Sequence, residues 1–325
     1  MTEDELIAAI RERLRDVGTQ RLTLGIGDDA AAWQPSRSNR SVITTDALVE
    51  GVHFRRDLMS ASDAGARALA SNLSDIAAMG ARPVLATIAL GFPADTDPAW
   101  LLDAYEGVAA QARRAKCAVA GGDLTRAPAI VFAITVVGEV RPSNLKTRDG
   151  ARPGDVVAVT GPLGASRAGL RIAEDRPDLA DRADLADALA AYRTPEPRLR
   201  EGRWLGASRH VRAMMDLSDG LSTDLARLCA ASGAGAVVEN VPAHPAALAV
   251  AAATNEDAEA WALGGGEDFE LLVAIEKRAF RHLAVRFAAH FGRPLLPVGR
   301  ISAETGLRRG DGAALAPSGW DHLHR

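Results

Sequence analysis

The sequence contains little cysteine and no long apolar run. Only Cys117 and Cys229 are cysteines among its 325 residues, and neither belongs to a C-x-x-C pair. A disulfide framework or a cysteine-based zinc site is therefore not expected. Both cysteines lie in apolar stretches, a setting that favours unreactive thiols in a hydrophobic core.

The chain also lacks the features of membrane and nucleic-acid-binding proteins. No run approaches the roughly 18 apolar residues that a membrane span needs. The N-terminal MTEDELIAAIRERL is acidic and amphipathic, unlike a signal peptide. The net charge is −4 and the sequence pI is near 6.0, so no basic field is available to hold nucleic acid. We therefore expect a cytoplasmic protein without membrane or nucleic-acid partners.

Familiar phosphate-binding and catalytic signatures are missing as well. There is no G-x-x-x-x-G-K-[ST], which excludes a P-loop enzyme, and H-R-D and D-F-G of protein kinases do not occur. No Ser-His-Asp or Cys-His constellation is evident. The run Gly161-Pro-Leu-Gly164-Ala-Ser166 precedes an expected helix. It fits either a cradle of backbone N–H groups for an anion or a plain strand–helix turn, and the sequence leaves both open.

What the chain does have is length and an alternation of strand and helix patterns. A single hydrophobic core rarely grows to 325 residues, so two α/β domains are expected. The polar stretch 141–154, with two prolines and two glycines, is the best candidate for a link between them. We therefore predict an N-terminal domain over residues 1–142 and a C-terminal α/β domain over 150–325. Residues 174–198 predict an exposed helix followed by a loop.

Periodicity and glycine positions predict the elements that carry acidic residues in the first half. A capping-box pattern at residues 2–5 starts a helix over about residues 3–16. A short strand over 41–45 is expected to end in Asp46. Gly121-Gly-Asp123 is expected to form a turn between a helix and a strongly apolar strand.

Aspartates recur at these expected strand ends and glycine turns. Loops at the ends of α/β strands are where ligand sites usually form. Carboxylates gathered there repel one another unless a cation lies between them, and Mg²⁺ takes oxygen ligands from carboxylates and substrate phosphates. Any one aspartate alone is more often a turn former or a helix cap. The set as a whole favours metal ligation: Asp28 and Asp29, Asp46, Asp75, Asp123, and Asp216 with Asp219.

Six strings occur in order over residues 25–272: GIGDDAA, TTDALVEGVHF, NLSDIAAMGARP, GGDLTR, DLSDGLSTDL and GGGEDFEL. Together they are similar to the thiamine-monophosphate kinase family, within the aminoimidazole-ribonucleotide synthetase superfamily. The resemblance covers nearly the whole chain. It implies a two-domain α/β (α+β) fold with a β-rich N-terminal domain that dimerises and binds ATP. It also implies a homodimer, ATP as co-substrate and several Mg²⁺ ions around the phosphates.

The resemblance also implies roles for particular residues. The metal ligands would be Asp29, Thr44, Thr45, Asp46, Asp75, Asp123, Asp216 and Asp219. Nucleotide contacts would come from Gly122, Asp123, Arg148 and Ser218, and substrate contacts from His53, Glu267 and Trp320. Two positions depart from the family pattern, because Phe269 and Trp320 stand where the family usually has tyrosine.

The implied reaction needs no catalytic base. A phosphate monoester has a second pKa of about 6, so its oxygen is already largely ionised at neutral pH. The difficulty is electrostatic, because two anions must meet, and metals held by the aspartates would reduce their repulsion and align them for direct in-line transfer. Arg148 would add a bidentate clamp on phosphate. Glu267 would suit the cationic thiazolium of thiamine or its amino group, the π face of Trp320 would suit the cation, and His53 would donate to the substrate phosphate.

Two kinds of rival remain at this point. Another enzyme of the same superfamily, above all aminoimidazole-ribonucleotide synthetase, would act on a different acceptor. A non-catalytic nucleotide-binding protein would keep the fold and lose metal carboxylates, and all the expected carboxylates are present here.

Overall fold

A computed structural model describes residues 2–18, 21–26, 30–320 and 323. The chain divides into two compact units. The N-terminal unit comprises Met1–Ile76 and Ala81–Pro142, and the C-terminal unit comprises Ala77–Gly80 and Ser143–Arg325. Within the described ranges, no helix is long and apolar enough to cross a membrane.

The N-terminal unit is built around a four-stranded sheet of order β3-β6-β4-β5. All neighbouring strands are antiparallel except β4 and β5, which are parallel. A separate hairpin joins β1 and β2. The elements are α1 (Glu3–Arg13), β1 (Leu22–Leu24), β2 (Ala32–Trp33), β3 (Arg40–Val49), α2 (Ala61–Ala78), β4 (Arg82–Phe92), α3 (Pro98–Ala115), β5 (Ala118–Arg126) and β6 (Val131–Val140).

Local sequence explains where the helices of this unit begin. Thr2 and Glu5 form both bonds of the predicted capping box at the start of α1. The Asp97 side chain accepts the N–H of Ala99 at the start of α3, where Pro98 occupies the first helical position. The helix expected over 3–16 is therefore confirmed, although it ends at Arg13.

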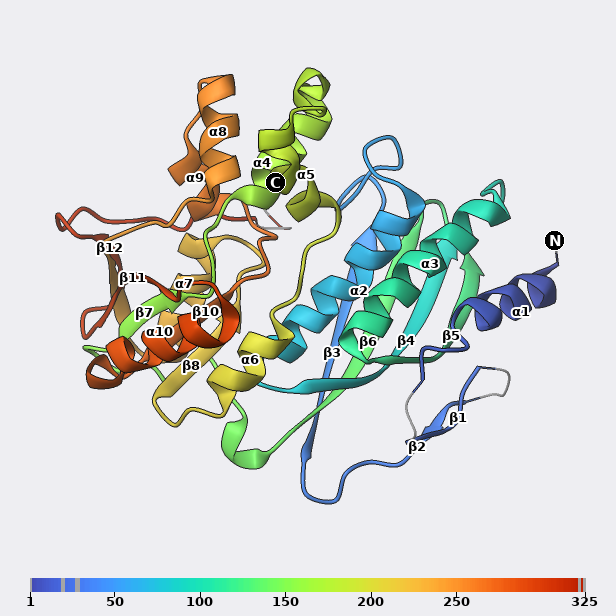
Figure 1. The fold of residues 1–325 in the computed structure, drawn as a ribbon, viewed down its shortest axis with the longest axis horizontal. Coiled ribbons are helices and arrows are strands. Elements are labelled where there is room, and N and C mark those ends of the chain that lie inside the picture. Colours follow the sequence, from blue (N-terminus) through green and yellow to red (C-terminus); the bar gives the residue numbers. More distant parts are fainter. Residues whose placement is uncertain (1, 19–20, 27–29, 321–322, 324–325) are drawn as a thin grey trace. The chain divides into compact units, whose positions relative to one another are not determined.

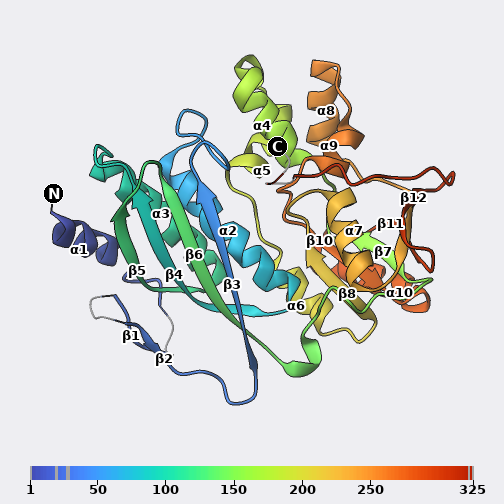
Figure 2. The ribbon, with the colours of Figure 1, turned by 180° about the vertical axis from the view of Figure 1, so that it is seen from behind.

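The two faces of this sheet are covered differently. Helices α2 and α3 lie along one face (Figure 1). In the opposite view, no helix of the described residues covers the strands of this sheet (Figure 2). We call the second face the open face. The part of the open face around Leu85 and Ala120 packs against Leu22 and Trp33 of the hairpin. Further along β3, Ile43 is 73% exposed on the open face.

Two sequence expectations were wrong in this unit. Asp46 does not end a strand, because β3 continues to Val49 and pairs with β6 along its whole length. Gly121-Gly-Asp123 is not a turn but the middle of β5. The glycine is required there because a Cβ on Gly122 would overlap the carbonyl oxygen of Ile88 on the neighbouring strand. Close strand approach, not chain reversal, explains this glycine.

The C-terminal unit contains a six-stranded mixed sheet of order β12-β9-β11-β7-β10-β8, in which only β12 and β9 are parallel. Its α-helices and strands are β7 (Val156–Val159), α4 (Ala165–Asp175), α5 (Ala186–Arg193), α6 (Leu199–Gly206), β8 (Val211–Asp216), α7 (Leu221–Ala231), β9 (Gly235–Val238), α8 (Pro245–Thr254), α9 (Ala258–Gly264), β10 (Leu271–Ile275), α10 (Lys277–Phe291), β11 (Leu296–Ser302) and β12 (Gly306–Arg309).

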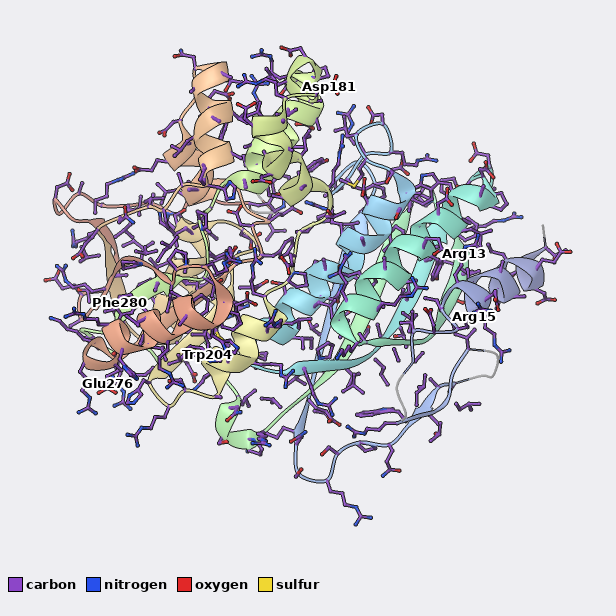
Figure 3. All side chains as sticks on the ribbon, in the orientation of Figure 1. Arg13, Arg15, Asp181, Trp204, Glu276 and Phe280 are labelled. Atoms are coloured by element: carbon purple, nitrogen blue, oxygen red, sulfur yellow. The ribbon has the colours of Figure 1, made fainter. Side chains whose placement is uncertain are left out.

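Alternation along the strands buries both faces of this sheet. Leu272 and Ala274 of β10 belong to one core cluster, which includes α7. Their neighbours Leu271 and Val273 belong to a second cluster with α10 on the opposite face. Figure 3 shows Trp204 of α6 at the α10 side, where its ring lies 5.8 Å from that of Phe287. Cys229 is buried in the first cluster, and desolvation raises the pKa of its thiol to about 12.

The segment expected to be an exposed helix and loop is only partly so. Residues 174–198 contain the end of α4, two 3₁₀ turns (Pro177–Leu179 and Ala183–Leu185) and α5. Leu185 and Leu189 are buried in a cluster with α4 and α8. The sequence did not reveal this buried face, because the segment is rich in Asp, Arg and Ala and only a few leucines form the face.

Candidate functional site

In the N-terminal unit, β3 and α2 bring three of the predicted metal ligands to one place. The Thr44 hydroxyl donates to the Asp75 carboxylate at 2.5 Å. The Asp46 amide donates to the Asn72 side chain at 3.0 Å, one helical turn before Asp75. Thr44 and Asp46 are two residues apart on a strand and so share its helix-covered face. The result is a cluster of oxygen donors between strand and helix.

Thr45, Gly122 and Asp123 do not join this cluster within the unit. Thr45 alternates with Thr44 and faces the open side, where its hydroxyl lies 3.2 Å from that of Thr135. Strand pairing aligns Asp46, Ile134, Ile88 and Gly122 in one row across the sheet. Three strand spacings make this row about 14 Å long. Asp123 follows on the edge strand β5 and is exposed.

His53 lies in the turn that follows β3. The ring Nδ1 of His53 accepts the backbone N–H of Val49 at 3.1 Å, and the backbone N–H of His53 donates to the Val49 carbonyl at 2.8 Å. A neutral ring that accepts at Nδ1 carries its proton at Nε2. The imidazole is thus oriented by the end of β3.

In the C-terminal unit, three chain segments meet at the end of β8. They are residues 217–220, 264–269 and 318–320. Glu267 donates its N–H to the Ser218 carbonyl at 2.7 Å, and Trp320 donates its N–H to the Asp219 carbonyl at 3.2 Å. The glycines at 264, 266 and 319 allow this approach, because a Cβ on each would come too close to backbone atoms of a neighbouring segment. Asp216, Ser218, Asp219, Glu267 and Trp320 are therefore brought together.

The segment before β10 has an unusual backbone. Gly266, Glu267 and Phe269 have φ angles of 71°, 55° and 49°. Positive φ costs a non-glycine residue on the order of 1–3 kcal/mol, and such residues cluster at ligand sites. Phe269 donates its N–H to the Leu217 carbonyl at 3.0 Å, so both strained non-glycine residues are fastened to the loop after β8.

Asp224 is an important residue that the sequence interpretation did not single out. Its buried carboxylate accepts the N–H groups of Asp219 and Gly220 at 3.0 and 3.1 Å. Desolvation raises the pKa of Asp224 to about 6. Arg227, one turn later on α7, pairs with both Asp219 and Asp224. The available signal was the position of Asp224 in the first turn of a helix that begins at Leu221 with no capping side chain.

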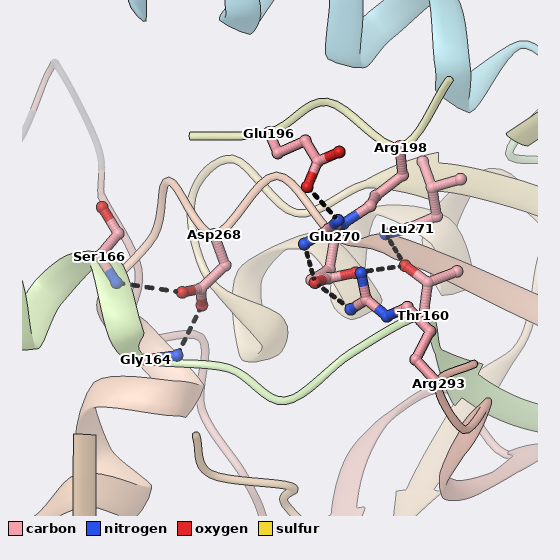
Figure 4. A network of polar contacts seen from close by, with 9 residues as sticks. All are labelled: Thr160, Gly164, Ser166, Glu196, Arg198, Asp268, Glu270, Leu271 and Arg293. Carbon is pink, nitrogen blue, oxygen red and sulfur yellow. Dashed lines mark hydrogen bonds and ion pairs between the residues drawn. The ribbon is translucent and has the colours of Figure 1, made fainter. Parts of the chain in front are cut away.

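Asp268 and Glu270 were also missed as individual residues, although both lie in a quoted motif. Asp268 accepts the N–H groups of Gly164 and Ser166 at the start of α4, at 2.7 and 3.4 Å (Figure 4). Of the two interpretations left open for residues 161–166, these contacts fit the cradle of backbone N–H groups, and the anion in it is the protein's own carboxylate. Desolvation raises the pKa of Asp268 to about 7.

Glu270 is the centre of a second network beside it. This buried carboxylate accepts the Thr160 hydroxyl at 2.6 Å and pairs with Arg198 at 2.8 Å and Arg293 at 2.5 Å (Figure 4). The two networks therefore anchor the chain just before β10, one through Asp268 and the other through Glu270.

Arg148 is exposed and lies elsewhere in the C-terminal unit. Its carbonyl accepts the Ser232 hydroxyl at 2.8 Å, at the C-terminal end of α7. Ser218 precedes the other end of that helix. The described part of the unit therefore does not place the Arg148 backbone beside Ser218. Asp29 lies outside the described residues.

The donor chemistry suits a hard cation, but the described residues do not form a ready-made metal centre in one place. Among the described residues, no three His, Cys, Asp or Glu side chains are grouped so as to hold a metal ion. In the N-terminal unit the Thr44 hydroxyl contacts the Asp75 carboxylate, and the backbone of Asp46 is held at the Asn72 side chain of the same helix. Mg²⁺ is typically held by one or two carboxylates and completes its octahedron with water and substrate phosphate.

The fold of each unit and the acidic residues that it carries are those of a two-domain protein of the AIR synthase related class. The N-terminal domain of that family matches residues 27–140, and its C-terminal domain matches residues 152–293. Thiamine-monophosphate kinase of Escherichia coli K12 is 36% identical over 326 residues, covering 99% of this chain and 98% of that protein. The chain belongs to the thiamine-monophosphate kinase family.

Solved structures agree with this assignment. The crystal structure of thiamine-monophosphate kinase from Stenotrophomonas maltophilia K279a is similar with a TM-score of 0.85 and 35% identity, covering 97% of this chain and 98% of that chain. A structure described as AaThiL complexed with AMPPCP and TMP has a TM-score of 0.79 and 29% identity, covering 98% of this chain and 96% of that one. The expected two-domain α/β fold is confirmed.

Proposed function

We propose that this chain transfers the γ-phosphoryl group of ATP to thiamine monophosphate, giving ADP and thiamine diphosphate. The observation that carries the proposal is full-length similarity to thiamine-monophosphate kinases at 36% identity. A similar structure was solved with the ATP analogue AMPPCP and with TMP, which matches the two substrates proposed here. The reaction would take place in the cytoplasm as the last step in making thiamine diphosphate.

The acceptor phosphate sets the physical problem. Its oxygen is mostly ionised at neutral pH, so nucleophilicity is supplied by the substrate itself. Two unit charges about 4 Å apart interact by about 4 kcal/mol at an effective dielectric constant of 20. The protein must therefore reduce repulsion and hold donor and acceptor in line, which are the main contributions in phosphoryl transfer.

The oxygen donors of both units answer this problem. Several Mg²⁺ ions would neutralise phosphate charge when bound. We assign Thr44, Asp46 and Asp75 to one group of ligands, and Asp216 with Asp219 to another. Asp29, Thr45 and Asp123 complete the proposed set. In the described structure the Asp219 carboxylate is paired with Arg227, so the loop after β8 already balances its negative charge.

The substrate contacts follow from the segments that meet around Ser218. Glu267 would bind the thiazolium or the amino group of the pyrimidine, and Trp320, which is 37% exposed, would present its ring to the cation. His53 would donate from Nε2 to the acceptor phosphate. Gly122, Asp123, Arg148 and Ser218 would contact the nucleotide.

We also propose a homodimer formed through the open face of the N-terminal sheet. Ile43 is 73% exposed there, and Ala47 and Ala89 are exposed on the same side. In a two-fold packing of open faces, β3 of one protomer can lie opposite β5 of its partner. That arrangement would bring together Thr45 and Asp123, which stand on opposite edge strands of one protomer.

The dimer is tested by placing a charge on its proposed centre. Ile43→Glu should convert the protein to a monomer in light scattering after size-exclusion chromatography, with an unchanged far-UV circular dichroism spectrum, because the side chain is exposed within one protomer. Val285→Glu, at a 65% exposed position of α10, is the matched control and should leave the mass unchanged. A dimeric Ile43→Glu protein, or a monomeric wild type, would contradict the proposal.

The reaction is tested by measuring ADP release with ATP and Mg²⁺ in the presence of thiamine monophosphate, thiamine or no acceptor, with the product identified by mass. We expect thiamine diphosphate only from the monophosphate. ADP release without that product would indicate another acceptor of the same superfamily. ATP binding without turnover with any acceptor would indicate a non-catalytic nucleotide-binding protein.

A further inference from the structure

The segment from Gly266 to Phe269 is held from one side by the loop after β8. Glu267 and Phe269 direct their N–H groups to the carbonyls of Ser218 and Leu217, at 2.7 and 3.0 Å. Both residues have positive φ, which an L side chain rarely adopts. Two backbone hydrogen bonds at two strained residues do not by themselves prevent the segment from relaxing toward an ordinary extended conformation.

Asp268, between these two residues, fastens the same segment from the other side. Its carboxylate accepts the N–H of Gly164 at 2.7 Å and that of Ser166 at 3.4 Å. Figure 4 shows both contacts at the first turn of α4. An anionic acceptor is favoured there by the unpaired N–H groups and the dipole of an 11-residue helix whose N-cap, Gly164, has no side chain.

We propose that Asp268 is a positioning residue that holds Glu267 in its left-handed conformation, so that the Glu267 carboxylate meets the cationic part of the acceptor. The inference rests on the proposed function, because it assigns Glu267 to thiamine monophosphate. Asp268 acts through the backbone: it clamps the segment to α4 while the N–H groups of its two neighbours clamp it to the loop after β8.

Glu270 lies two residues further on and provides an internal comparison. Its partners are Thr160, Arg198 and Arg293, which hold the first residues of β10 and not the strained segment. Weakening this network should lower stability without moving Glu267. Arg293→Gln is the matched variant, because Glu270 keeps Thr160 and Arg198.

The test is steady-state kinetics of Asp268→Asn, Asp268→Ala and Arg293→Gln, with KM measured separately for both substrates. Asn keeps one acceptor oxygen and Ala keeps none, so KM for thiamine monophosphate should rise in the order wild type, Asn, Ala. We expect at least about a tenfold rise for Ala. KM for ATP should stay within about twofold in both, and Arg293→Gln should change neither KM while lowering Tm.

Hydrogen exchange of the folded proteins gives a readout that does not need activity. The amides of Glu267 and Phe269 should exchange faster in both Asp268 variants than in Arg293→Gln. Unchanged exchange there, or equal rises of both KM values, would overturn the positioning role. If the wild type makes no thiamine diphosphate but the two Asp268 variants still show the faster exchange, the proposed function and the acceptor assignment are contradicted, and the clamp itself stays supported.

Discussion

In the N-terminal unit, Thr44, Asp46 and Asp75 are carried by a long strand and a long helix with ordinary backbone angles. In the C-terminal unit, Ser218 and Glu267 stand in loops, and Glu267 has a positive φ. Regular elements position side chains through their own hydrogen bonds. Loops need additional anchors, which Asp224 and Asp268 supply by accepting backbone N–H groups. In the C-terminal unit, acids therefore hold the loop backbone in place, a task that strand and helix hydrogen bonds perform in the N-terminal unit.

The anchoring acids of the two units also differ in electrostatics. In the N-terminal unit Glu139 accepts two hydrogen bonds of 2.7 Å from Arg21, and this pairing lowers its pKa to about 2. In the C-terminal unit desolvation raises the pKa of Asp268 to about 7, although backbone N–H groups oppose the shift. Charged partners and desolvation thus move two buried carboxyls in opposite directions.

The largest expected effect follows from removing the exposed carboxylate of Asp46, which we propose as a metal ligand on a regular strand. Asp46→Asn should keep the fold, because the Asp46 backbone contact to Asn72 is unchanged. A metal supplies several kcal/mol of charge stabilisation, so activity should fall at least about 100-fold. Activity and circular dichroism would be measured together. Asp63→Asn, at the first turn of α2, should remain fully active, and equal activity of the two variants would refute the ligand assignment.

The next effect concerns the glycine pair of β5. Gly122→Ala places a Cβ onto the Ile88 carbonyl and should cost about 2–3 kcal/mol in the free energy of unfolding. Gly121→Ala meets nothing within 4 Å and should cost less than about 0.5 kcal/mol. Urea unfolding of the two variants makes the comparison. Similar stabilities would show that the β4–β5 approach does not require glycine.

The third prediction uses the lowered pKa of Glu139. A carboxyl whose folded pKa lies below its unfolded value of 4.5 stabilises the protein above that value. This contribution, about 2 kcal/mol after allowance for solvent screening, should disappear as the pH falls from about 4.5 toward 2. Glu139→Gln should be less stable at pH 7 and should lack this acid limb. A parallel loss of stability with pH in both proteins would contradict the account.

The smallest effect comes from Asp268, with the opposite sign. Its folded pKa, about 7, lies above the unfolded 3.8, so its contribution to stability is present below pH 4 and is lost as the pH rises toward 7. Between pH 5 and pH 8, Asp268→Asn should therefore lose less stability than the wild type, by about 1 kcal/mol after allowance for solvent screening of this half-buried side chain. Asp224 titrates in the same window in both proteins. A steeper loss in the variant would be evidence against a raised pKa.

Features set by local sequence could be predicted, and features set by contacts between distant segments could not. The helix at residue 3 and the helix Pro98–Ala115 were predictable, because their caps and periodicity are local. The position of Asp46 inside a strand was not, because pairing with β6 extends β3 beyond it. The sequence made Gly122 look like a turn glycine, because the neighbouring strand that requires a glycine there cannot be seen in the local sequence. Asp224 and Asp268 were hidden inside motifs, because a buried anchor and a ligand use the same residue type.

Transfer of the intact γ-phosphoryl group of ATP to a phosphate acceptor is tested most directly by an isotope measurement. ATP whose γ-phosphate carries ¹⁸O at all three non-bridging oxygens would be supplied with thiamine monophosphate, and the product analysed by mass. The account predicts thiamine diphosphate with all three heavy oxygens in its terminal phosphate, and no such product from thiamine. Unlabelled thiamine diphosphate, or labelled product formed from thiamine, would contradict it.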